Sequence, residues 1–97
     1  MTNVAQATQT VATEYNGWSN RETWLANLWL NNDEQSYNVL MDAIAIPAPV
    51  YDKAEWLKEQ LETQLNDELD VACMWKDLLR HAFNQIDWVE LVRSNLE

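Results

Sequence analysis

The sequence of 97 residues contains few of the residues on which catalytic and ligand sites are usually built. It has one cysteine, Cys73, so no disulfide can form within the chain, as expected for a protein of a reducing compartment. A single glycine, Gly17, cannot form a glycine-rich loop that cradles a phosphate. Six Lys and Arg oppose sixteen Asp and Glu, which argues against direct binding to nucleic acid or to an anionic membrane, because both require basic patches.

The sequence also lacks a recognisable metal or nucleophile site. Its one histidine, His81, lies eight residues after Cys73, which on a helix separates the two by roughly 12 Å, too far for a thiolate–imidazole pair. No Cys/His cluster has zinc spacing, and no Asp-x-Asp-x-Asp-Gly loop for calcium is present. We therefore expect no cofactor, no metal and no enzymatic activity. A small hydrolase built on carboxylates that meet in space is the enzymatic alternative.

The distribution of apolar residues predicts one small domain outside the membrane. No apolar run approaches the roughly 20 residues that cross a bilayer, and residues 1–14 lack the charged start and apolar stretch of a secretory signal. We therefore expect a cytoplasmic protein. With 47% hydrophobic residues and six Trp, the chain has enough apolar surface to fold. Residues 1–14 show no sustained period and predict a flexible tail, and 15–97 predict a single helical domain.

Helical patterns run through the predicted domain. Ser19 and Glu22 have the spacing of a capping box, in which Ser19 is the N-cap, and Asp87 with Glu90 repeats this spacing near the end of the chain. Between these signals, apolar residues recur at helical spacing. Residues 47–49, which hold both prolines, form the only evident linker. The pattern predicts an all-α fold, a compact bundle of four or five short helices.

The third and fourth helices are the least clearly separated. The third is expected from about residue 50 to 66 and the fourth from 67 to 84. Their junction, Asn66-Asp67-Glu68, contains no Gly or Pro, so one long bent helix is an alternative.

The stretch from residue 15 to 33 holds three of the six Trp. Trp24, Leu25, Leu28 and Trp29 form a stripe at helical spacing, so we expect Trp24 and Trp29 to be buried in the core. The alternative is that this Trp-rich helix is itself a docking surface. Asn is a poor helix former, so the several Asn residues of this helix predict specific side-chain hydrogen bonds.

The third helix carries a second candidate surface. Asp52, Glu55, Glu59 and Glu62 are spaced three, four and three apart, which places them within an arc of about 80° on the side away from the apolar row. Successive carboxylates lie about 5 Å apart along the axis, a spacing that resembles that of phosphates along a nucleic-acid strand. With Trp56 at the edge of the arc, these residues predict a contact face for a protein partner with a basic surface. The alternative is an ordinary solvated face.

The motif in residues 16–32 resembles that of a family of small uncharacterised proteins. Its members carry an N-G-W-x-N-x-E-T-W-x-x-x-L-W-x-x-N-type segment, and the segments around Trp56 and Trp88 are similar too. Such proteins occur in bacteriophage, plasmid and bacterial genomes. The resemblance implies a small accessory protein of mobile-element type, and it assigns no activity and no functional residue.

These observations predict a non-enzymatic, acidic protein-binding module. In its sharper form it is a phage-type inhibitor that mimics nucleic acid and blocks a host nucleic-acid-binding or defence protein, such as a restriction or CRISPR effector. The alternative is a regulatory or structural adaptor that docks through its Trp-rich helix. Binding by an acidic face should weaken steeply with salt, whereas binding by an apolar face should not.

Overall fold

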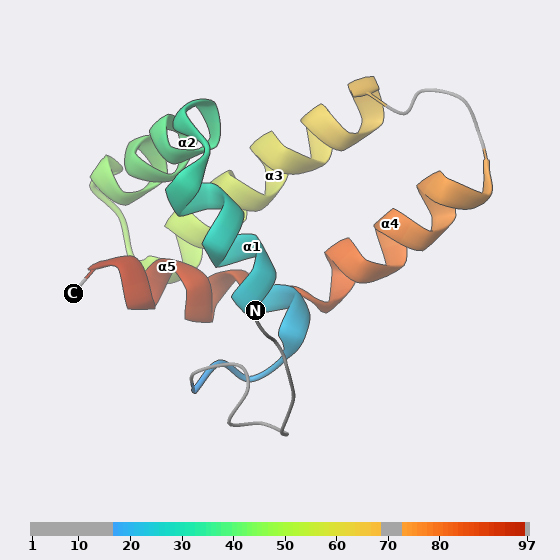
Figure 1. Ribbon diagram of the computed structural model, residues 1–97. Helices are drawn as coiled ribbons and strands as arrows, with labels where there is room; N and C mark the ends of the chain where they lie inside the picture. Colours follow the sequence, from blue (N-terminus) through green and yellow to red (C-terminus); the bar gives the residue numbers. More distant parts are fainter. Residues whose placement is uncertain (1–16, 69–72, 97) are drawn as a thin grey trace.

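The structure, a computed structural model, describes residues 17–68 and 73–96 and folds them into α-helices (Figure 1). The predicted all-α class is confirmed, and neither described range contains a strand. The tail predicted at residues 1–14 lies outside the described residues. The helices are α1 (Arg21–Asn32), α2 (Glu34–Ala45), α3 (Val50–Glu68), α4 (Met74–Gln85) and α5 (Trp88–Leu96). None of these helices is long and apolar enough to cross a membrane.

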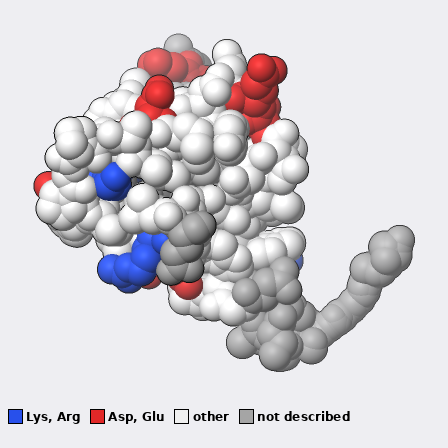
Figure 2. Space-filling model, turned by 90° about the vertical axis from the view of Figure 1, so that its left-hand side faces the viewer, with Lys and Arg blue, Asp and Glu red and all other residues white. Residues whose placement is uncertain are grey.

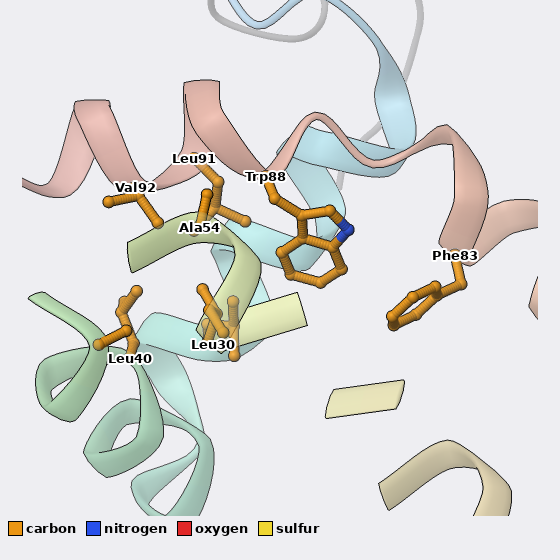
Figure 3. Close-up of a cluster of buried hydrophobic side chains, with 9 residues drawn as sticks. Leu30, Leu40, Ala54, Phe83, Trp88, Leu91 and Val92 are labelled. Carbon is orange, nitrogen blue, oxygen red and sulfur yellow. The ribbon is translucent and has the colours of Figure 1, made fainter. Parts of the chain in front are cut away.

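The core lies where α1, α2, α3 and α5 meet, and α4 extends from it along one side (Figures 1 and 3). α3 packs on α5 and α2, whereas α4 packs chiefly on α1. Nine apolar side chains form the buried cluster, and α4 supplies one of them, Phe83. The others are Leu30, Leu40, Ala43, Ala54, Leu57, Trp88, Leu91 and Val92.

Asn20, rather than the predicted Ser19, is the N-cap of α1. The Oδ1 atom of Asn20 accepts a hydrogen bond from the Thr23 N–H at 2.8 Å, and its Nδ2 donates to the Gln85 carbonyl at 2.7 Å. Ser19 instead donates from its N–H and its hydroxyl to the Glu90 carboxylate, at 3.1 and 2.7 Å. The prediction was wrong by one residue because the side chains of Ser19 and Asn20 both bind residues of the α4–α5 region. Such long-range contacts cannot be predicted from local spacing.

Asp87 caps α5, as the sequence predicted. Its Oδ1 atom accepts from the Glu90 N–H at 3.0 Å, but the Glu90 carboxylate does not accept a hydrogen bond from the Asp87 N–H. The Asp87 N–H donates instead to the hydroxyl of Thr23 at 2.8 Å, and Thr23 is fully buried. One half of the capping box is therefore replaced by a hydrogen bond that Asp87 donates to Thr23 of α1.

α3 and α4 are separate helices, so the alternative of one long bent helix is wrong. α3 continues to Glu68, and α4 begins at Met74 rather than at the predicted Asp67. Cys73 occupies the N-cap of α4, where its Sγ accepts from the Lys76 N–H at 3.4 Å.

The linker predicted at residues 47–49 is confirmed, because α2 ends at Ala45 and α3 begins at Val50. Across it, the Lys53 ammonium donates to the Ile44 carbonyl at the end of α2.

The hydrogen bond between Thr23 and Asp87 gives a first prediction. Thr23→Val keeps the side-chain volume and leaves the Asp87 N–H without this acceptor, so we expect a loss of about 2 kcal/mol in the free energy of unfolding. Thr23→Ser keeps the hydroxyl, loses one buried methyl group and should cost about 1 kcal/mol. Urea unfolding followed by Trp fluorescence measures both values. Equal stability of the Val variant and the wild type would contradict the prediction.

The position of the α1 cap gives a second prediction. Asn20→Ala removes the side-chain acceptor for the Thr23 N–H and should cost about 1 kcal/mol. Ser19→Ala removes an exposed hydrogen bond and should cost less, within about 0.5 kcal/mol of the wild type. Thermal unfolding of the two variants compares their stabilities directly. A larger loss of stability in Ser19→Ala would indicate that Ser19, and not Asn20, is the N-cap of α1.

Candidate protein-interaction site

α3 is continuous from Val50 to Glu68, so the four predicted carboxylates lie on one helix. They are Asp52, Glu55, Glu59 and Glu62. Asp52 and Glu59 are exposed, whereas Glu55 and Glu62 are half-buried. Glu62 pairs with Arg80 of α4 at 3.4 Å, the one ion pair among the described residues. Asp52 and Glu59 are therefore the two of the four that stand freely in solvent.

Glu55 lies at the border between α3 and the start of α5. It lines a hollow of about 310 Å³ together with Lys58 of α3 and Asp87, the cap of α5. Lys58 thus places a positive charge beside the acidic side of α3 at this border.

On the face shown in Figure 2, which is seen from the α2 side of Figure 1, acidic atoms gather toward the upper part and uncharged atoms cover most of the rest. On this face the acidic side chains are therefore unevenly distributed.

Trp56 packs partly into the fold. Its side chain is half-buried and contacts the buried apolar cluster. A large aromatic in this position stabilises the domain through its buried area. The remaining exposed part still borders the acidic side of α3.

The Trp-rich stripe of α1 differs most from the sequence prediction. Trp24 is half-buried and is not part of the buried cluster, and Trp29 is 66% exposed, so the expectation that both are buried in the core was wrong. Leu25 and Leu28 are also exposed. With about 100° per residue, this stripe is centred opposite the two fully or nearly fully buried residues of α1, Thr23 and Leu30. The rotation of α1 that lets Thr23 accept from the Asp87 N–H and places Leu30 in the core therefore leaves the stripe on the outer side.

The outward stripe borders an apolar groove that the sequence did not predict. The groove has a volume of about 310 Å³ and lies between α1, the C-terminal half of α3 and α4. Glu22 is the one charged residue in its lining. The apolar walls include Leu25 and Trp29 of α1, Leu61 and Leu65 of α3, and Leu79 and Ala82 of α4. A signal was present in the sequence, since the apolar residues of α4 cover half of its circumference.

Trp88 is one of the residues that line the groove. Its ring lies between the Leu30 side of the core and Phe83, whose ring centroid is 5.2 Å away (Figure 3). The indole N–H of Trp88 is buried and has no acceptor among the described residues. Buried donors usually find a partner. The Trp88 N–H is an exception, and because its nitrogen is fully enclosed by the fold it offers no contact to an occupant of the groove.

The Asn residues of α1 make the specific hydrogen bonds that their repetition predicted. Asn95 of α5 donates from Nδ2 to the Oδ1 of Asn27 at 2.7 Å, and Asn31 donates to the same oxygen at 3.0 Å. Asn31 also donates to the backbone carbonyl of Asn27 at 2.9 Å. These amides join α1 to α5, so they act in the fold.

The residues that could support catalysis are dispersed. Cys73 and His81 are both exposed on α4. Within residues 17–68 and 73–96, no group of three or more His, Cys, Asp or Glu side chains is arranged to hold a metal ion. The chemistry that the described surface offers is therefore apolar contact in the groove and charge on the outer side of α3.

The exposure of Trp29 gives a third prediction, with its neighbour Leu30 as the matched control. Trp29→Ala should change the free energy of unfolding by less than about 1 kcal/mol, because an exposed side chain contributes little to the core. Leu30→Ala, at a position only 4% exposed, should cost about 2–5 kcal/mol. Chemical denaturation separates the two. A loss at Trp29 as large as that at Leu30 would place Trp29 in the core of the protein in solution.

Comparison with known proteins finds a family and no individual relative. No curated protein and no solved structure matches the chain. A family model described as a family of unknown function, DUF7249, matches residues 11–94. An uncharacterised family is also what the resemblance of the Trp motif implied. Because the match spans most of the sequence, the chain belongs to this family of unknown function.

Proposed function

We propose that the protein is a non-enzymatic protein-binding module that contacts a basic partner through the outer side of α3. The contact residues in this proposal are Asp52, Glu55, Glu59 and Glu62, with the exposed edge of Trp56. The observation that supports it is the pair of exposed carboxylates, Asp52 and Glu59, on a helix with six acidic residues and two lysines. Seven residues of helix separate the pair by about 10 Å.

In its sharper form, the partner is a nucleic-acid-binding protein. The acidic side of α3 would occupy the basic groove that otherwise holds the phosphates. This is how an inhibitor encoded by a mobile element would block a restriction or CRISPR effector in the host cytoplasm. The charge of −10 supports the proposal because charges of one sign steer association with a surface of the opposite sign.

The test reverses two charges on α3 and, as a control, two on α2. Asp52→Lys with Glu59→Lys changes the proposed face. Glu34→Lys with Asp42→Lys changes the net charge equally, at one position in the first turn and one in the last turn of α2, both of them exposed. Circular dichroism confirms that both variants fold.

The readout is capture of proteins from a bacterial lysate and their release by duplex DNA. We expect the wild type and the α2 control to retain nucleic-acid-binding proteins that DNA or high salt displaces, and the α3 variant to lose them. Equal loss in both variants would mean that net charge alone attracts these proteins and would refute a contact face on α3.

A second candidate function is favoured by the exposure of Trp29. An adaptor that docks through its Trp-rich helix would present this ring to a partner, since exposed Trp residues are frequent binding hot spots. Trp29→Ala would then abolish capture at low and high salt alike. Retention of the same proteins by Trp29→Ala would exclude the adaptor.

A further inference from the structure

The hollow between α3 and the start of α5 adjoins the acidic side of α3. Its volume is about 310 Å³, and its walls come from the first half of α3 and from residues 86–89. The apolar part of the lining includes Ala54 and Trp88, which are 2% and 8% exposed. Glu55, Lys58 and Asp87 add charged groups to the same lining. The hollow therefore offers an apolar floor with charged groups around it, unlike the groove between α1, α3 and α4.

Tyr51 gives this hollow an aromatic end. It is the one large apolar side chain of α3 that is exposed, and 64% of its surface is open to solvent. Lys58, the other end of the lining on α3, lies seven residues further, about 10 Å along the helix. Tyr is frequent among the residues that dominate binding, and aromatic rings attract cationic groups. A cation is therefore favoured at the Tyr51 end and disfavoured at the Lys58 end.

The two carboxylates of the hollow are not neutralised within the described structure. The one ion pair among the described residues joins α3 to α4, so Lys58 forms none with Glu55 or Asp87. Asp87 uses its Oδ1 atom to cap α5, and its carboxylate has a second acceptor oxygen. Glu55 lies one turn after Tyr51 on α3. A cationic group that contacts the Tyr51 ring can therefore reach the Glu55 carboxylate.

We propose that the hollow binds one arginine side chain of the basic partner, an inference that rests on the function proposed for α3. The guanidinium group stacks on the Tyr51 ring and donates hydrogen bonds to the carboxylates of Glu55 and Asp87. The aliphatic part of the arginine lies over the apolar floor, as the stems of long basic side chains do. Tyr51 and Asp87 thus join the contact residues of α3.

The lining fits arginine better than lysine. A guanidinium group is planar, so it can stack on a ring and still donate to two acceptors, and it is more weakly hydrated than an ammonium group. A lysine brings a compact and strongly hydrated charge that gains less from the ring and from the second carboxylate. The exposed carboxylates of Asp52 and Glu59 attract both kinds of residue, whereas the hollow selects arginine.

The test compares hexa-arginine with hexa-lysine as probes. Isothermal titration calorimetry measures their binding to the full chain at low salt. The two peptides carry the same charge, so a difference in affinity reports the guanidinium group and not net charge. We expect hexa-arginine to bind at least about fivefold more tightly, because one stacked and hydrogen-bonded guanidinium distinguishes the two complexes.

Substitutions at Tyr51 test the aromatic end of the hollow. Tyr51→Ala should abolish the preference for hexa-arginine, and Tyr51→Phe should retain it because the ring remains. The matched control is Tyr37→Ala, since Tyr37 is an exposed tyrosine of α2 outside the hollow. The control should show the preference of the wild type.

A second pair of variants tests the carboxylate. Glu55→Gln should reduce the preference for hexa-arginine. Glu59→Gln removes an equal charge from an exposed position of α3 outside the hollow. It should weaken both peptides by the same factor and leave their ratio unchanged. The ratio of the two affinities therefore separates the arginine site from the general attraction of an acidic helix.

The possible outcomes distinguish the arginine site from the contact face on α3. Equal affinity of the wild type for the two peptides would refute the arginine site, and so would a preference that survives both Tyr51→Ala and Glu55→Gln. The contact face would remain if Asp52→Lys with Glu59→Lys still abolished peptide binding. If that double variant bound both peptides like the wild type, the contact face would be refuted. A preference that still depended on Tyr51 would then leave the arginine site in place.

Discussion

The buried hydroxyl of Thr23 is the contact on which the rest of the surface depends. It accepts from the backbone N–H of Asp87, and Asn20 and Ser19 add bonds to Gln85 and Glu90. An unsatisfied buried polar group costs about 1–3 kcal/mol, so this network fixes the rotation of α1 against the α4–α5 junction. Leu30, seven residues on, then enters the core, and Leu25 and Trp29 turn toward the groove.

The groove and the outer side of α3 are therefore two separate surfaces, and they contribute to binding through different interactions. The groove is apolar, and its contribution to binding scales with the area that an occupant removes from water. The outer side of α3 is charged and exposed, so its contribution acts over longer distances and falls with salt. The Glu62–Arg80 pair lies where the two surfaces meet. This pair joins α4 to α3 but contributes little stability, because both of its side chains are more than a third exposed.

The sequence predicted the elements of this fold better than their orientation. Periodicity located the helices, and the Asp87 cap was recognisable because its acceptor and donor lie three residues apart. The cap of α1 and the rotation of α1 were not recognisable, because both depend on partners more than 60 residues away, Gln85 and Asp87. Hydrophobic periodicity favoured burial of the Trp29 stripe, whereas the structure buries Thr23 and Leu30 on the opposite side of α1. The acidic side of α3 follows from helix geometry, but the pairing of Glu62 with α4 required the tertiary structure.

The exposed stripes of α1 and α4 show what hydrophobic periodicity does and does not predict. An apolar face at helical spacing indicates that a helix will be covered, because leaving several large apolar side chains in water is unfavourable. It does not indicate whether the cover comes from the same chain. In α3 and α5 the apolar faces meet each other, and Ala54, Leu57 and Leu91 are almost fully buried. In α4 the pattern is equally regular, yet in the described structure Phe83 alone of its apolar side chains is buried, and Met74, Trp75 and Leu78 are each more than half exposed. The same sequence signal therefore corresponds to a core in one half of this protein and to an exposed apolar face in the other.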